Sequence, residues 1–139
     1  MIKCTIVAVA VILLLSSDTR PADIVITNDR GGTVTTYAYW FRGIAARRDR
    51  VVIDGYCASS CTLALAIPTT CATPRSVFGF HAAYDSFFGV NIGIDAELTR
   101  YFMSQYPKRI RDWLNARGGL TPGLKYLKGA ELAALVKRC

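Results

Sequence analysis

Hydrophobic and polar positions follow two different periods in the first third of this chain. Residues 23–27 and 51–53 are short, β-branched and almost wholly apolar, which is typical of buried strands. Between them, residues 33–47 carry apolar side chains at three- and four-residue spacings, which indicates a helix with one apolar face. A strand, a helix and a second buried strand in this order predict a βαβ unit of a parallel sheet.

The same order of elements continues beyond the second strand. Residues 55–61 form a turn of small residues, and residues 62–67 are apolar on all sides, as in a buried helix that Pro68 ends. Residues 76–80 predict a third strand. A glycine-bearing loop then extends to residue 93. Three predicted helices follow it, at 95–105, 107–116 and 129–137. The pattern predicts an α/β fold of repeated βαβ units with a parallel sheet.

Residues 1–17 have the composition of a secretory leader. A basic start at Lys3 precedes an apolar run over 4–15, which is shorter than the about 20 residues that a membrane-spanning helix needs. We expect a signal peptide or, since no small-x-small cleavage pattern follows, an uncleaved anchor. A buried strand is the alternative, because 5–11 is rich in β-branched residues. The protein is then periplasmic or secreted, with a single domain at 23–139 and membrane contact only through the leader.

Composition favours one small domain with a basic balance. Of the 139 residues, 52% are hydrophobic, which excludes a disordered chain. Lysine and arginine number 17 against 10 acidic residues, so the net charge is +7. The basic side chains are scattered and do not alternate with aromatic ones, so we expect no nucleic-acid partner.

Four cysteines follow the leader, and an even number in an exported chain predicts disulfides. Their spacing lacks the paired C-x2-C geometry of zinc sites, and the chain has one histidine, so no metal is expected. Among the three pairings we favour Cys61 with Cys71, which bracket the short helix and the loop after it. Cys57 with Cys139 is expected only because these two cysteines then remain.

Three predicted strand ends carry chemically useful residues: Gly31 and Gly32, then Ser59, then His81. Ligands of parallel α/β sheets gather at the carboxyl ends of strands, so we expect these residues to converge. A serine needs a base to take its proton, and His81 is the only imidazole in the chain. A Gly-Gly turn can aim backbone N–H groups at a developing oxyanion. The pattern therefore predicts a nucleophile, a base and an oxyanion site.

Each of these residues also has a purely structural interpretation. Ser59 or Ser60 can cap the helix that follows, His81 can be a core histidine bonded to a carbonyl, and the two glycines can form a plain turn. The serine is not in a G-x-S-x-G sequence, which disfavours the α/β-hydrolase nucleophile elbow. The catalytic interpretation depends on the order of the three elements along the chain.

The same three blocks carry a family resemblance. N-D-R-G-G at 28–32, G-Y-C-A-S at 55–59, and Pro74 seven residues before His81 resemble the proteolytic subunit of the Clp protease and its crotonase-fold relatives. Those families read N-S-P-G-G, G-x-A-A-S and P-x6-H. More specifically, C-A-S-S-C-T-L-A-L followed by C-x2-P and F-G-F-H is similar to small exported bacterial proteins described as periplasmic and Clp-protease-like.

The resemblance implies a crotonase-like spiral of βαβ units, trimmed at its N-terminus or completed by another subunit. Ser59 would be the nucleophile, His81 the general base, and Gly31 and Gly32 would lie beside the oxyanion together with the amide of Ser60. The family takes its third catalytic residue, an aspartate, from a later helical segment that has no aspartate in this chain.

Two arrangements of the catalytic residues therefore stay open. One is a Ser-His dyad. The other is a triad that uses Asp85, Asp95 or Asp112.

The leading hypothesis is an exported serine hydrolase, in the first place a peptidase, that acts on a peptide or protein without a cofactor. The alternative is a non-catalytic binding protein that keeps the Clp/crotonase-like fold. Acyl-thioester chemistry of the crotonase kind is a weaker third hypothesis, because it needs a coenzyme A site and does not suit export. A homo-oligomer is compatible with all three.

Overall fold

Three parallel strands form the centre of the molecule in the computed structural model, which describes residues 21–139. The predicted leader at 1–17 lies outside the described residues. In chain order the elements are β1 (Asp23–Asp29), α1 (Val34–Arg47), β2 (Arg50–Ala58), the 3₁₀ helix η1 (Ser59–Ala66), β3 (Cys71–Ala72), β4 (Val77–Phe80), β5 (Tyr84–Phe87), β6 (Val90–Ile94), α2 (Ala96–Gln105), α3 (Lys108–Asn115), β7 (Lys125–Leu127) and α4 (Gly129–Leu135). The α/β class expected from the sequence is confirmed.

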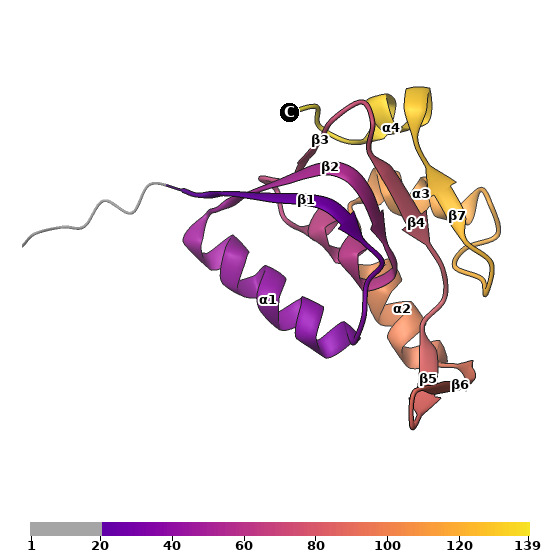
Figure 1. Cartoon of the computed structure of the whole chain (residues 1–139). Coiled ribbons are helices and arrows are strands. Elements are labelled where there is room, and N and C mark those ends of the chain that lie inside the picture. The colour runs from indigo at the N-terminus through magenta and orange to yellow at the C-terminus, as the bar shows by residue number, and fades with distance from the viewer. Residues whose placement is uncertain (1–20) are drawn as a thin grey trace, which may run out of the picture.

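The main sheet has the strand order β1-β2-β4-β7, and the short β3 pairs with β2. All pairings among β1, β2, β3 and β4 are parallel, whereas β7 runs antiparallel to β4. The first predicted βαβ unit is β1-α1-β2, and η1 lies in the connection from β2 to β4. The arrowheads of β1, β2 and β4 consequently point to the same edge of the sheet (Figure 1).

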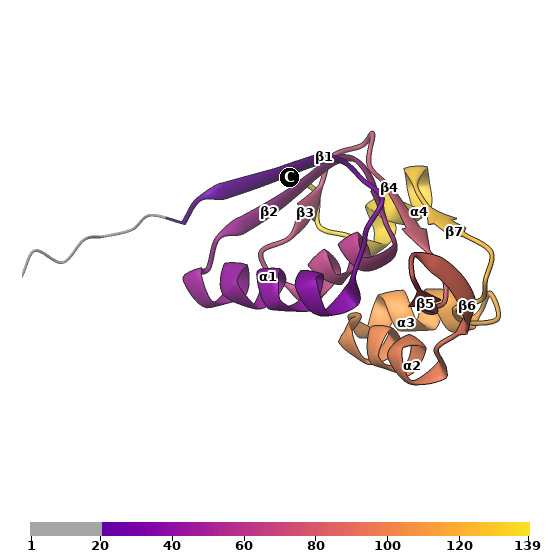
Figure 2. The same cartoon turned by 60° about the horizontal axis from the view of Figure 1, so that its bottom comes forward.

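Helices cover one face of the sheet, and the core lies between these two layers. Figure 2 shows α1, α2 and α3 on the same side of the strands. The apolar face of α1 places Phe41 and Ile44 against the sheet, where Val51 and Ile53 of the central strand are fully buried. No helix of the described chain has the length and apolarity to cross a membrane.

The junction between β2 and η1 differs from the predicted turn. Residues 55–58 stay in β2, and η1 begins directly at Ser59. Gly55 makes this continuation possible, because its φ is +152° and a β-carbon there would lie 2.0 Å from the Thr27 carbonyl oxygen. The register of β1 against β2 shifts at the same place, between Ile26 and Asn28. A local bulge therefore takes the place of the predicted turn.

The region predicted as a loop up to residue 93 contains the β5-β6 hairpin, which projects from the molecule beyond the end of β4 (Figure 1). Phe88 and Gly89, at its tip, both have positive φ. The short β3 and β7 were also not predicted. They have two and three residues, which is too short to show a period of two.

The four described cysteines form two disulfides, but the predicted pairing is wrong. Cys57 pairs with Cys61 at a Cα–Cα distance of 5.4 Å, and Cys71 pairs with Cys139 at 5.0 Å. One turn of η1 folds Cys61 back onto the end of β2. The last residues run beside β3, where the Cys139 N–H donates to the Ala72 carbonyl. Two disulfides are typical of proteins that fold in an oxidising compartment.

Candidate active site

The edge where β1, β2 and β4 end carries the residues that the sequence singles out. Asp29 pairs with Cys57 across β1 and β2, and Ala58 pairs with Gly79 across β2 and β4. The chain therefore leaves the three strands at nearly the same level of the sheet. Parallel pairing thus explains why the residues just after each strand come together.

All five sequence-predicted site residues line one cavity of about 810 Å³. Gly31 and Gly32 come from the loop after β1, Ser59 and Ser60 from the start of η1, and His81 from the end of β4. The remaining wall comes from the start of α1, the β5-β6 hairpin, α2 and the segment before β7. The expected convergence of the three blocks is therefore present in the tertiary structure.

Ser59 has an unusual backbone conformation at the first position of η1. Its φ is +56°, in the left-handed region that residues other than glycine rarely adopt. The Thr62 hydroxyl donates to the Ser59 carbonyl at 2.6 Å, and the same hydroxyl lies 2.6 Å from the buried Tyr106 hydroxyl. Tertiary contacts thus hold the turn in a conformation that a free chain would avoid, as is common at functional sites.

The two adjacent serines have different environments. Ser60 is fully buried, and its hydroxyl donates to the carbonyl oxygen of Gly32. Ser59 is half-buried, and its hydroxyl has no hydrogen-bond partner among residues 21–139. Neither serine caps the helix, because the N-cap residue is Ala58 and no side chain bonds there. Of the two hydroxyls, Ser59 therefore has the one that is available for chemistry.

The Gly31 and Gly32 loop packs directly on the turn at Ser59 and Ser60. A β-carbon on Gly31, whose φ is +81°, would lie 2.6 Å from the Cβ of Ser59 and 2.8 Å from the backbone nitrogen of Ser60. The Gly31 N–H already donates to the carboxylate of Asp29 at 2.7 Å. The Gly32 N–H has no acceptor among the described residues. Of the two glycines, only Gly32 therefore has an amide free to bind an oxyanion.

His81 is half-buried, and its Nδ1 lies 2.6 Å from the carbonyl oxygen of Ala82. Because a carbonyl only accepts, the Nδ1–H donates, and the lone pair of the neutral ring is on Nε2. The ring of Tyr84 packs against the imidazole with centroids 5.5 Å apart. This arrangement fixes the tautomer in which His81 can accept a proton through Nε2.

None of the three candidate aspartates bonds to His81 within the described chain. Asp95 caps α2, because its Oδ1 accepts a backbone N–H of the first turn at 2.9 Å. Asp112 pairs with Lys108 at 2.6 Å on the exposed side of α3. Asp85 lines the cavity from β5. The carbonyl of the following residue thus takes the position at Nδ1 that a carboxylate has in a triad, and no hydrogen bond joins Ser59 to His81 among residues 21–139.

The Cys57–Cys61 disulfide encloses Ser59 within its short loop, and both sulfurs are fully buried. With the predicted pairing, the turn at Ser59 would have been tied to the loop before β4. The observed pairing leaves that loop to the Cys71–Cys139 disulfide instead. The serine turn is therefore clamped locally, by the cysteines two residues before and two residues after Ser59.

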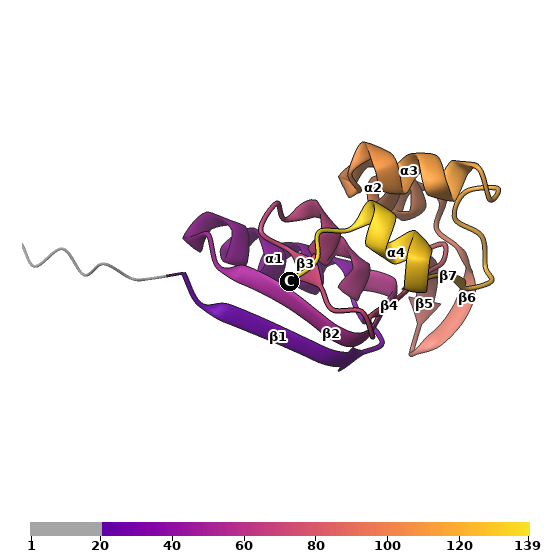
Figure 3. The ribbon, with the colours of Figure 1, turned by 90° about the horizontal axis from the view of Figure 1, so that it is seen from above.

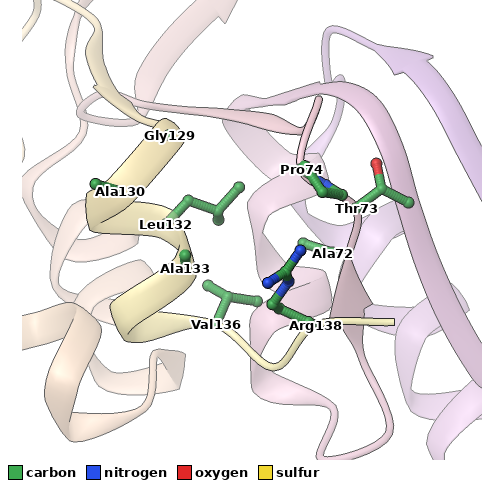
Figure 4. A pocket seen from close by; sticks show the side chains of 9 residues that line it. All are labelled: Ala72, Thr73, Pro74, Gly129, Ala130, Leu132, Ala133, Val136 and Arg138. Carbon is green, nitrogen blue, oxygen red and sulfur yellow. The ribbon is translucent and has the colours of Figure 1, made fainter.

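A second pocket, of about 220 Å³, lies between α4 and the segment after β3 (Figure 4). Leu132 of α4 and Val136, which directly follows this helix, form one side of the pocket, and Ala72 with Arg138 forms the other. Seen from above, the C-terminus lies beside β3, and α4 lies toward the β7 end of the sheet (Figure 3). None of the predicted site residues contributes to this pocket. In the part of the chain that the structure describes, no group of three His, Cys, Asp or Glu side chains could hold a metal ion.

Two features of the cavity were not predicted from the sequence. These are the bond from Asp29 to Gly31 and the packing of Tyr84 on the imidazole. The first has a sequence signal, since an aspartate two residues before a glycine is typical of a side-chain-stabilised turn. The second depends on side-chain rotation and has no local signal. The carbonyl partner of His81 is the bond that the structural interpretation of this histidine expects.

No protein-family model matches this sequence, and no curated protein matches it. The resemblance to Clp-type proteases therefore stays a prediction from the sequence motifs.

Proposed function

We propose that this protein is a serine hydrolase that cleaves an acyl bond of a peptide or protein substrate. One observation carries the proposal: Ser59, in a left-handed turn and with no hydroxyl partner among residues 21–139, lines the same cavity as His81 and the Gly31 and Gly32 loop. A nucleophile, a base with the correct tautomer and two backbone donors are the parts that acyl transfer requires.

In the acylation step, Ser59 Oγ attacks the substrate carbonyl carbon while Nε2 of His81 takes the hydroxyl proton. The carbonyl oxygen becomes an oxyanion, which the N–H groups of Gly32 and Ser60 stabilise. The bond to the leaving group then breaks, and the imidazolium gives its proton to that group. The product of this step is an ester between the substrate acyl group and Ser59.

In the deacylation step, His81 takes a proton from water, whose oxygen attacks the ester carbonyl, and Ser59 Oγ recovers the proton on leaving. The Ala82 carbonyl orients the ring but carries no full charge, so it stabilises the imidazolium less than a carboxylate would. We therefore expect slower turnover than that of a complete Ser-His-Asp triad.

The fold that goes with this proposal is a crotonase-like, Clp-protease-like domain. The parallel strands, the βαβ order and the position of the cavity support it. The two disulfides and the apolar start of the chain support export to the periplasm or beyond the cell.

Labelling with a fluorophosphonate, followed by mass mapping of the adduct, tests the proposal on the oxidised protein. We expect an adduct on Ser59 that is lost in Ser59→Ala and strongly reduced in His81→Gln. Ser104→Ala, which removes an exposed hydroxyl on α2 outside the cavity, should label like the wild type. Labelling that persists in Ser59→Ala would contradict the mechanism.

A non-catalytic binding protein is the second candidate, and the uncharged partner of His81 favours it. In that case the cavity would hold a peptide without cleaving it. Folded, disulfide-bonded protein that shows no adduct at Ser59 would favour this second function.

A further inference from the structure

The carboxylate of Asp29 connects three parts of the molecule around the cavity. Asp29 is the last residue of β1, and its Oδ1 accepts the Gly31 N–H at 2.7 Å. The same oxygen accepts the hydroxyl of Tyr37, on the first turn of α1, at 2.6 Å. One oxygen atom therefore holds the loop to its own strand and to the helix that follows it.

The position of this loop also determines the position of the serine turn. Gly31 leaves no room for a β-carbon against Ala58, Ser59 and Ser60, and the Ser60 hydroxyl bonds to the Gly32 carbonyl. A shift of the loop would therefore move the free amide of Gly32 relative to Ser59. Sub-ångström placement of such donors decides how well they stabilise an oxyanion.

We propose that Asp29 and Tyr37 are positioning residues that hold the Gly31 and Gly32 loop in its oxyanion-binding arrangement. This inference rests on the proposed hydrolase function. Asp29 occupies one glycine N–H and so leaves the other, that of Gly32, as the loop's donor to substrate. Tyr37 supplies the second bond that fixes the direction of the carboxylate.

The environment of Tyr37 suits this role. Burial, together with the bond to the Asp29 carboxylate, raises the pKa of the Tyr37 phenol to about 12. The phenol therefore stays protonated, and remains a donor, at any pH at which the protein would work.

Fluorophosphonate labelling rates and ester hydrolysis by the full-length oxidised protein provide the test. We expect Asp29→Ala to lower the labelling rate and kcat at least about tenfold with little change in KM, because binding contacts remain. Asp29→Asn keeps an acceptor oxygen and should recover part of the rate. Tyr37→Phe should lose roughly threefold. Tyr39→Phe is the matched control, since Tyr39 lies on the same helix and is 78% exposed.

Amide hydrogen exchange supplies a readout that does not need activity. Asp29→Ala should speed exchange of the Gly31 N–H at least about tenfold while exchange in β2 is unchanged. Wild-type labelling at Ser59 with equal rates and equal exchange in Asp29→Ala would overturn this inference and leave the hydrolase proposal intact. If the wild type is not labelled, the hydrolase proposal fails. Hydrogen exchange alone then tests whether Asp29 holds the loop. Faster exchange of the Gly31 N–H in Asp29→Ala supports that role, and unchanged exchange overturns it.

Discussion

Gly31 lies so close to Ser59 that a β-carbon at position 31 would be 2.6 Å from the Cβ of Ser59. Real β-carbons are essentially never found at that distance, and the other close atoms, the Ala58 carbonyl oxygen and the Ser60 nitrogen, belong to the backbone. The contact joins the end of β1 to the end of β2. Through this contact, the position of the proposed oxyanion loop determines the position of the proposed nucleophile.

Gly31→Ala should therefore destabilise the protein and abolish labelling of Ser59. We expect a loss of about 3 kcal/mol in the free energy of unfolding, from the positive φ and from overpacking together. Gly118→Ala separates the two causes, because Gly118 has a similar φ of +83° and no neighbour within 4 Å. Urea denaturation should give a loss of about 1 kcal/mol for that control. Equal losses in the two variants would show that the close approach has no energetic consequence.

The two disulfides should have different effects when each is removed by paired Cys→Ala substitution. Cys71–Cys139 spans a sequence separation of 68, so its loss should cost roughly 4 kcal/mol. Cys57–Cys61 spans a separation of 4, so its loss should cost roughly 2 kcal/mol. Only removal of Cys57–Cys61 should slow labelling of Ser59 in protein that is still folded, because that disulfide encloses the serine turn. An unchanged labelling rate in the Cys57 and Cys61 double variant would disprove the local clamp.

Thr62 should matter more for stability than its bonding partner Tyr106. The Thr62 hydroxyl has one proton, which goes to the Ser59 carbonyl, so it must accept from the Tyr106 hydroxyl. Thr62→Val removes both bonds and leaves a buried phenol unpaired, at a cost of about 2 kcal/mol, whereas Tyr106→Phe should cost about 1 kcal/mol. Thr62→Ser keeps the hydroxyl and serves as the control. Thermal unfolding of the three variants decides the order, and a smaller loss for Thr62→Val than for Tyr106→Phe would contradict it.

Asp49 should contribute to stability in a pH-dependent way. Its carboxylate is almost buried and accepts the Ala22 N–H at 3.0 Å and the Arg47 guanidinium at 2.7 Å. These bonds hold the pKa of Asp49 below its ordinary value of 3.8. A lowered pKa in the folded state stabilises the protein above pH 3.8, and this contribution is lost as the pH falls through the folded pKa.

Asp49→Asn should accordingly be less stable than the wild type at pH 7, and the difference should shrink below pH 3.8. Denaturation at a series of pH values measures the difference. Asp112→Asn, which breaks an exposed pair with Lys108, is the control and should change stability by only about 0.5 kcal/mol. A constant difference between wild type and Asp49→Asn down to pH 2 would refute the prediction.

Much of the element order could be predicted because apolar periodicity is a local property. The helix at 33–47 and the strand at 76–80 correspond closely to α1 and β4. The β5-β6 hairpin was missed although Val90, Ile92 and Ile94 alternate with polar or small residues. All three side chains are exposed, so the hairpin does not follow the rule that alternation buries one face.

The sequence by itself determined the α/β order and the meeting of Gly31, Ser59 and His81, because parallel strands end at one edge of a sheet. Only the tertiary structure decided how the cysteines pair, which glycine amide is free and what orients His81. Each of these depends on the distance and direction between groups within a packed fold: β3 beside the C-terminus, Asp29 beneath the loop, and the imidazole turned toward Ala82. The sequence specifies which groups come near the site, whereas packing specifies which of them bond to one another.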